Sequence, residues 1–497
     1  MRLSIITFYF LIQILFFILL PAMLIGYFIL IPVIYVIYCL SPTETETKNK
    51  LKNDFISSHL LNQENLPIVE KWFESYYQTL YHKALWWKIA NLFSNPPLAR
   101  DWSVGYTPIL DEYVEDLTSS AYQAKIKNIV DREKEIGEIE RDLSKSSENN
   151  VVIVGEEGVG KHTIVDALAK KIYEGQINNL LMYKRVLKLN MEKILTKYTD
   201  QKQREFFLEE LFKEAVDAKN VIMLIDDFDK YISSGTDRVD LSTPIEKFAK
   251  TALIQIIGIT TPFFYQKFVF NNGKINRIFN KIDVYEVSKS EAERILLQNT
   301  AVFEKRYAIK IPYESIKNTI DKSDFYITYI PFPEKAIELL DSACVYTKQI
   351  DKNKQVLPEI VDKILSEKTH IPTTLSEPMK QKLANMENLL LAKIIQQNEA
   401  IKKLSSSLRR SFILSGKRKK PLATFLFLGP TGVGKTETAK TISRVFFGSE
   451  KYLVRFDMSM YQSKEDIPNL IGSIDSGNPG FLTKALRENP YGVLLLD

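Results

Sequence analysis

Residues 425–437, FLFLGPTGVGKTE, decide the fold class of this 497-residue chain. An apolar run that reads as a buried strand leads into a glycine-rich turn and then into the start of a helix. The turn has the pattern G-x-x-x-x-G-K-[ST] with one additional glycine, through Gly429, Gly432, Gly434, Lys435 and Thr436. Backbone N–H groups at such a turn can curl around a polyphosphate, the lysine can reach the terminal phosphates, and the threonine hydroxyl can ligate Mg²⁺. The stretch therefore predicts a phosphate-binding loop.

A second copy of this pattern lies upstream, at residues 151–163, VVIVGEEGVGKHT. The predicted nucleotide-binding residues of this copy are Gly155, Gly158, Gly160, Lys161 and Thr163. The hydroxyl position itself holds His162, and a neutral imidazole is a poor ligand for Mg²⁺. Thr163 comes about 100° further round the helix and faces elsewhere. We therefore predict two tandem nucleotide-binding modules, of which the first is altered.

Composition narrows the functional classes. The net charge of +5 is too mild to imply nucleic acid, and the two cysteines, Cys39 and Cys344, provide no disulfide framework. Four scattered histidines show no metal-ligand spacing. The basic cluster at residues 409–420 is interpreted as a solvated loop. The alternative is that it binds nucleic acid or anionic lipid.

Residues 3–40 carry no charged side chain and predict a membrane anchor. A single helix of this length would span about 57 Å, against about 30 Å for the hydrocarbon core. Pro21 divides the run, so we favour two spans; one kinked span and a cleaved signal peptide are the alternatives. The lysines at 48, 50 and 52 predict that the following modules lie on the cytoplasmic side.

Residues 54–102 read as helical and hold all four tryptophans, Trp72, Trp86, Trp87 and Trp102. A helical hairpin that buries its own aromatic side chains is the favoured interpretation. A helix at the level of the lipid headgroups is the alternative.

From residue 107 onward, the chain resembles the Clp-type AAA+ unfoldases of the ClpB and ClpC kind. The likeness rests on TPILDEYVEDLT (107–118), IVDREKEI (129–136), the two phosphate loops and IPFPEKAIELLDSA (330–343), and it extends to the end of the chain. This resemblance implies an α/β fold of tandem AAA+ P-loop modules, each a parallel sheet with flanking helices and a helical small subdomain. It also implies ATP and Mg²⁺ as cofactors.

The expected organisation has five parts. They are a membrane anchor over 1–42, an aromatic-rich helical segment over 43–106, a first large subdomain over 107–285, its helical small subdomain over 286–375, and a second module over 376–497.

The resemblance also implies roles for residues of the first module. VIMLIDDFD (221–229) resembles a Walker B strand, in which Asp226 would hold Mg²⁺ and Asp227 replaces the glutamate that orients the attacking water. Thr261, or alternatively Thr260, resembles the sensor of the γ-phosphate. Arg277 resembles an arginine finger that acts on a neighbouring subunit, while Ile278 has replaced a second arginine.

Other residues would contact adenine or substrate. Tyr198 resembles the aromatic residue of the first pore loop, which grips substrate in the central channel. Adenine contacts are expected at Ile129 and Val130 in the first module and at Ile394 and Ile395 in the second.

The second module reaches its own Walker B strand in YGVLLLD (491–497), where Asp497 would hold Mg²⁺ together with Thr436. Because the chain stops on this aspartate, we expect it to be a fragment of a longer protein. The module also lacks the aromatic residue of the family's second pore loop.

The function expected from the sequence is that of a membrane-anchored, ATP-driven protein unfoldase with a degenerate first site. Expected partners are unfolded or tagged proteins, further copies of the chain in a hexamer, and a peptidase. A non-catalytic nucleotide-binding regulator or scaffold is the main alternative, and a membrane-tethered nucleic-acid motor is a weaker one.

Overall fold

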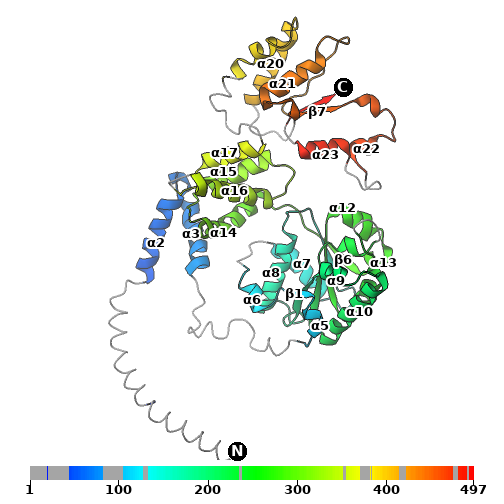
Figure 1. Cartoon of the computed structure of the whole chain (residues 1–497). Helices are drawn as coiled ribbons and strands as arrows, with labels where there is room; N and C mark the ends of the chain where they lie inside the picture. The colour runs from blue at the N-terminus through cyan, green and yellow to red at the C-terminus, as the bar shows by residue number, and fades with distance from the viewer. Residues whose placement is uncertain are drawn as a thin grey trace, which may run out of the picture. The chain divides into compact units, whose positions relative to one another are not determined.

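The computed structural model in Figure 1 divides the chain into two compact units, Met1–Phe73 and Glu74–Asp497. It describes residues 20, 44–81, 105–126, 132–233, 238–350, 354–369, 381, 383–413, 421–473, 480–489 and 492–497.

The first unit contains α2 (Glu44–His59) and the start of α3 (Leu66–Tyr81), joined through the short helix η1 (Gln63–Asn65). Its core is aromatic: the ring of Phe55 stacks on His59 at 3.9 Å between centroids and meets Trp72 edge-on at 4.9 Å. Phe55, Trp72 and Phe73 are all buried. The described part of the aromatic segment therefore forms a helical hairpin around its own rings, while Trp86, Trp87 and Trp102 lie outside the described residues.

A six-stranded sheet forms the centre of the first module, with strand order β1-β3-β4-β5-β2-β6. Its strands are β1 (Val114–Asp116), β2 (Asn150–Val154), β3 (Arg185–Leu189), β4 (Val221–Ile225), β5 (Gln255–Thr260) and β6 (Phe279–Asp283). Neighbouring strands are parallel except for β1, which pairs antiparallel with β3. The predicted parallel sheet is thus a mixed one, because the segment that leads into the module adds an edge strand of opposite direction.

Helices cover both faces of this sheet, so its central strands are buried on both sides. In β2, Val152 and Val154 join the core cluster that contains α10, whereas Val151 and Ile153 join the cluster that contains α7 and α8. Alternate residues of a strand point to opposite faces, which explains why all five residues of β2 are buried. The helices of these two layers are α7 (Glu133–Leu143), α8 (Lys161–Glu174), α10 (Gln201–Ala218), α11 (Ser242–Ala249) and α13 (Gly273–Asn276).

Shorter elements connect these layers. They are α5 (Pro108–Asp111), α6 (Ser120–Gln123), α9 (Met191–Lys197), η3 (Phe228–Tyr231), α12 (Pro262–Phe264) and η4 (Tyr265–Phe270).

A bundle of four helices follows the sheet: α14 (Lys289–Tyr307), α15 (Tyr313–Tyr326), α16 (Glu334–Ile350) and α17 (Pro358–Thr369). The first of them begins with a capping box between Ser288 and Glu291. Glu286, in the connection from the sheet, accepts hydrogen bonds from Lys335 Nζ at 2.9 Å and from the backbone N–H of Phe332 at 2.7 Å. Residues 330–343, which resemble the helical small subdomain, contain the start of α16 at Glu334.

The second module contains a two-stranded parallel sheet of β7 (Leu453–Phe456) and β8 (Val493–Leu496). Its helices are α19 (Met386–Leu391), α20 (Asn398–Ile413), α21 (Lys435–Phe447), α22 (Ile467–Ile471) and α23 (Phe481–Glu488), with the short helices η6 (Glu450–Tyr452) and η7 (Met458–Met460). A small core of Met386, Leu390, Leu404 and Ile442 holds α19, α20 and α21 together.

The buried strand predicted before the second phosphate loop is wrong for the described residues. Residues 425–428 pair with no strand there, and Leu426 and Leu428 are 83% and 84% exposed. In the first module the corresponding strand, β2, pairs only with β5 and β6, both of which follow β4, the predicted Walker B strand, in the sequence. The described part of the second module contains no counterpart of those two strands.

The predicted membrane-anchored location, with ATPase modules on the cytoplasmic side, is corrected by the helices that the structure describes. None of them is both long enough and apolar enough to cross a bilayer. The two longest described helices, α14 and α10, carry charged side chains in their first and last turns. The proposed spans over residues 3–40 lie outside the described residues except for Leu20.

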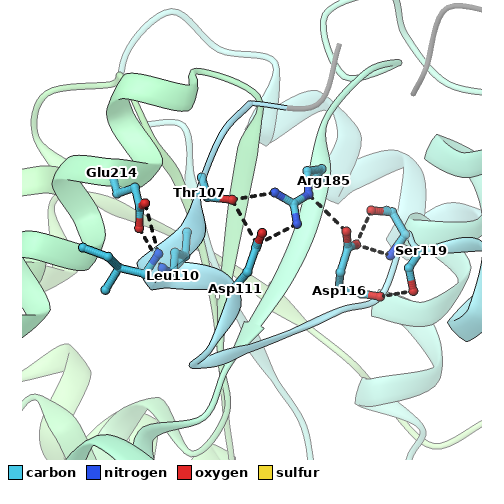
Figure 2. A network of polar contacts seen from close by, with 9 residues as sticks. Thr107, Leu110, Asp111, Asp116, Ser119, Arg185 and Glu214 are labelled. Atoms are coloured by element: carbon cyan, nitrogen blue, oxygen red, sulfur yellow. Dashed lines mark hydrogen bonds and ion pairs between the residues drawn. The ribbon is translucent and has the colours of Figure 1, made fainter. Parts of the chain in front are cut away.

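Arg185, the first residue of β3, ties the leading segment of the module to the sheet (Figure 2). This buried guanidinium donates hydrogen bonds to Thr107 Oγ1 at 2.8 Å, to Asp111 Oδ1 at 2.9 Å and to Asp116 Oδ2 at 3.1 Å. On the other side of α5, the backbone N–H of Leu110 donates to Glu214 of α10 at 2.7 Å. Charge-assisted hydrogen bonds thus hold this segment against β3 and α10.

Replacing Arg185 should loosen the leading segment. Arg185→Met removes three hydrogen bonds and leaves Asp116 without its cation, which should lower the free energy of opening β1 and β3 by about 2–4 kcal/mol. Amide hydrogen exchange of β1 and β3 measures the change. Lys281→Met is the control, since its partly exposed ion pair with Asp283 contributes about 1 kcal/mol or less. Equal protection in the two variants would contradict the assigned role of Arg185.

Candidate functional site

The first phosphate loop joins β2 to α8 and has the backbone that its glycines predict. Gly158 and Gly160 have φ angles of +87° and +93°, which favour glycine, and Gly160 precedes the first turn of α8. At Gly155, an added Cβ would lie 2.7 Å from the carbonyl oxygen of Val284, so a larger side chain would force the strands apart. The loop therefore presents backbone N–H groups and a helix N-terminus at the carboxyl edge of the sheet.

Lys161 lies folded against this loop. Its Nζ donates to the carbonyl oxygens of Gly155 at 2.6 Å and Glu156 at 3.0 Å. Burial lowers the pKa of Lys161, while the nearby carboxylates of Glu157, Glu156 and Asp226 act in the opposite direction. A phosphate group that enters the loop would offer this buried ammonium a stronger acceptor than two carbonyls.

Asp226, the predicted Walker B aspartate, lies between the side chains of a lysine and a histidine. Lys188 Nζ of β3 is 3.1 Å from Asp226 Oδ2, and His162 Nε2 of α8 is 3.5 Å from Asp226 Oδ1. Asp227 has a left-handed backbone at φ +47° and forms an ion pair with Lys230 at 2.6 Å. Both acids predicted to serve metal and water are thus engaged by nitrogen groups.

The third acid of this motif, Asp229, is structural. It is 2% exposed, accepts a hydrogen bond from Thr260 Oγ1 at 2.7 Å and pairs with Arg238 at 3.1 Å. Burial raises the pKa of Asp229, and Thr260 and Arg238 oppose that shift. Thr261, the predicted sensor, instead caps α12 by accepting a hydrogen bond from the N–H of Phe264 at 3.4 Å.

Arg277, the predicted arginine finger, is exposed just after α13. Its neighbour Ile278, which stands in place of the second arginine, belongs to the buried core beside Phe279. Tyr198 is half-buried, and its ring lies 4.6 Å from that of Phe207.

The adenine-contacting residues predicted for the first module, Ile129 and Val130, lie outside the described residues. Arg132, which follows them, donates to the carbonyl oxygen of Val159 in the phosphate loop at 2.7 Å and to that of Tyr285 at 3.1 Å. This guanidinium therefore joins the phosphate loop to the start of the connection that leads to the four-helix bundle.

The second phosphate loop repeats the geometry of the first. Gly432 and Gly434 again have φ angles of +87° and +93°, and Lys435 Nζ donates to the carbonyl oxygens of Gly429 at 2.7 Å and Pro430 at 2.8 Å. The helix α21 begins at Lys435, so that the Thr436 side chain lies in its first turn.

A residue that flanks the second loop makes a contact like that of its counterpart beside the first loop. Gln397 donates to the carbonyl oxygen of Val433 at 3.4 Å, as Arg132 does in the first module. Of the predicted adenine contacts, Ile394 is buried and Ile395 is 83% exposed. Asp497 lies at the end of β8 and pairs with Arg455 of β7 at 2.7 Å.

Both loops present donors that suit a polyphosphate, but only the second presents oxygen ligands that suit Mg²⁺. The second loop offers the Thr436 hydroxyl and the Asp497 carboxylate, and oxygen ligands of this kind suit Mg²⁺. Asp226 pairs with Lys188 as Asp497 pairs with Arg455, but in the first module an imidazole, His162, takes the place of the hydroxyl, with its Nε2 atom 3.5 Å from Asp226 Oδ1. This donor set does not match a magnesium site.

The basic partners Lys188 and Arg455, and the structural acid Asp229, were not among the residues predicted from the sequence. One signal was present, because RVLKL and LVRF each place a basic residue, Lys188 and Arg455, between two apolar ones. Which acid each of these basic residues contacts depends on the register between neighbouring strands, and the sequence alone does not determine that register.

Three parts of the chain match known families. Residues 151–263 match the ATPase family associated with various cellular activities (AAA), residues 288–390 match the AAA lid domain, and residues 420–497 match the AAA domain (Cdc48 subfamily).

Curated relatives and solved structures extend this likeness over most of the chain. The ATP-dependent Clp protease ATP-binding subunit ClpE of Lactococcus lactis is 30% identical over 449 residues, which cover 78% of this chain and 60% of the relative. The negative regulator of genetic competence ClpC/MecB of Bacillus subtilis is 29% identical over 458 residues, covering 79% and 56%. The chain thus spans little more than half the length of these two relatives.

A structure of Hsp104 with ATPγS and FITC casein in a closed state superimposes with a TM-score of 0.66 at 28% identity, covering 78% of this chain and 68% of that one. The S. cerevisiae Hsp104–casein complex in an extended conformation gives a TM-score of 0.63 at 27% identity, covering 78% and 67%.

Thr260, the last residue of β5, and Thr261, which follows it, should differ in their effect on stability. Thr260→Val removes a hydrogen bond from the buried carboxylate of Asp229 and should cost about 1–3 kcal/mol of unfolding free energy. Thr261→Val removes only a long helix-capping bond and should cost about 1 kcal/mol or less. Chemical denaturation of the two variants, which are matched in size and branching, measures the difference. A larger loss at Thr261 would contradict the structural role of Thr260.

Proposed function

Because the chain carries AAA+ P-loop modules of the Clp/Hsp100 type, we propose that it acts as an ATP-dependent protein-unfolding chaperone with a degenerate first site. The observation that supports this most is that two phosphate loops share one backbone geometry, each with its lysine directed at the loop carbonyls. The sequence likeness to Clp subunits and the structural likeness to Hsp104 with casein support the substrate class, an unfolded protein.

In this proposal the second loop belongs to the hydrolytic module. Lys435 binds the terminal phosphates, while Thr436 and Asp497 hold Mg²⁺, which offsets the charge of the phosphates when it is bound. Arg277 serves a neighbouring copy of the chain, which accounts for its exposed position and favours a ring, a hexamer by resemblance. A peptidase that receives the unfolded chain is a further proposed partner.

The first module binds nucleotide and turns it over slowly. Asp227 stands in place of a glutamate, and its side chain is one methylene shorter. Its carboxylate forms an ion pair with Lys230 at 2.6 Å. A carboxylate held in this way is poorly placed to orient water. His162 provides no hydroxyl for a metal ion, so two separate requirements for hydrolysis are missing.

A non-catalytic regulator or scaffold is a second candidate. One observation favours it: Tyr198, the predicted pore residue, packs on Phe207. In this case nucleotide binding would control assembly without traction on a substrate. ATP-dependent unfolding of a fluorescent protein by rings of the chain would distinguish the unfoldase from the scaffold.

The degenerate first module can be tested by restoring its chemistry in the full chain with Lys435→Ala, which silences the second loop. Asp227→Glu alone should change ATP turnover little, because His162 remains. Combining Asp227→Glu with His162→Thr and Lys188→Ala should raise turnover by about tenfold or more, since a metal ligand and a longer carboxylate are supplied and Asp226 is released from its ion pair. Release of inorganic phosphate measures the rates.

Two controls accompany this test. Lys161→Ala should abolish the restored turnover, because the first loop then lacks the lysine that reaches the phosphates. A first module that already turns over ATP at the restored rate, before any of these substitutions, would refute its proposed degeneracy.

A further inference from the structure

Each Walker B aspartate pairs with a basic residue of the neighbouring strand, at the same place in the register. Lys188 in β3 and Arg455 in β7 each lie opposite the residue two positions before the aspartate. The ion pairs measure 3.1 Å for Lys188 with Asp226 and 2.7 Å for Arg455 with Asp497. In both modules, one carboxylate oxygen is therefore directed at a cation that belongs to the chain.

The two modules differ at the other carboxylate oxygen. Asp226 Oδ1 lies 3.5 Å from His162 Nε2 and accepts a hydrogen bond from the N–H of Asp227 at 3.1 Å. The residue at the position of His162 in the second module is Thr436, which offers oxygen. A Mg²⁺ ion demands near-octahedral oxygen ligands and gives up its water reluctantly. At Asp226 it would meet an ammonium and an imidazole instead.

The role that a metal ion has in such a site can be taken by these attached cations. A carboxylate and a polyphosphate repel each other, so a positive charge must lie between them. Lys188 supplies such a charge at Asp226, and Lys230 supplies one at Asp227. The two acids of the loop itself, Glu156 and Glu157, are exposed to solvent, which screens their effect on a bound phosphate.

We infer that the first phosphate loop binds adenosine di- or triphosphate free of divalent metal, with Lys188 in place of Mg²⁺ beside Asp226. This inference rests on the proposed function, in which the first module binds nucleotide. In addition, the site selects the metal-free form of the nucleotide. A nucleotide held without metal would remain in place as a structural ligand while the second module responds to Mg²⁺.

The test uses the full 497-residue chain with Lys435→Ala, so that only the first loop keeps its lysine. Binding of ATP and ADP that carry a fluorescent N-methylanthraniloyl group is measured in excess MgCl₂ and again in excess EDTA. The dissociation constants in the two conditions should agree within about threefold. Adding His162→Thr and Lys188→Ala should create a site that binds at least about tenfold more weakly in EDTA than in MgCl₂.

Lys281→Ala is the matched control, because Lys281 forms an ion pair of similar exposure with Asp283 on β6. It should bind like the Lys435→Ala parent in both conditions. If the parent already binds about tenfold more tightly with MgCl₂, the inference is overturned while nucleotide binding by the first module stands. If the parent binds neither nucleotide in either condition, the proposed function of the first module fails, and the inference fails with it.

Discussion

The parallel pairing of β2 with β5 on one side and β6 on the other is the constraint on which the first module depends. The ladder continues into the phosphate loop, where the N–H of Gly155 donates to the carbonyl oxygen of Thr260 at 3.3 Å. On the other side, the N–H of Val284 donates to the carbonyl oxygen of Val154 at 2.7 Å. Because β4 pairs with β5, this arrangement also brings the acids that follow β4 to the edge where the loop begins.

At that edge, three acids of one motif have three different surroundings. Asp226 and Asp227 are partly exposed and pair with lysines, whereas Asp229 is buried with Thr260 and Arg238. Burying a charged group is costly unless it is paired and hydrogen-bonded, which explains why Asp229 has two partners. Asp226 and Asp227 can exchange their lysine partners for a ligand at a small cost in free energy, because exposed ion pairs are weak. The buried Asp229 instead holds β5 against the turn that follows β4. The motif therefore combines two ion-paired, solvent-accessible acids with one buried structural acid within four residues.

The parts of this structure that the sequence predicts well are local. Glycines that need positive φ, a helix that starts at a lysine, and an apolar strand that ends in acids all depend on neighbours within about ten residues. The parts that sequence reasoning missed depend on distant partners. Lys188 meets Asp226 only because β3 and β4 pair in one register, and the packing of Tyr198 on Phe207 depends on how α10 meets α9. Residues 425–428 read as a buried strand, yet burial requires neighbours that hydrophobicity cannot supply by itself.

The two phosphate loops separate what glycines determine from what a sheet determines. Their paired φ angles agree at +87° and +93°, although β2 has two strand partners and residues 425–428 have none among the described residues. The conformation of the loop is therefore local, set by glycine and by the first turn of a helix. The sheet determines the surroundings of the loop, because strand pairing decides which acidic and which basic side chains face it. For this reason an intact loop pattern indicates phosphate binding, but the chemistry at each site follows from side chains on the neighbouring strands, Lys188 and Asp226 in one module and Arg455 and Asp497 in the other.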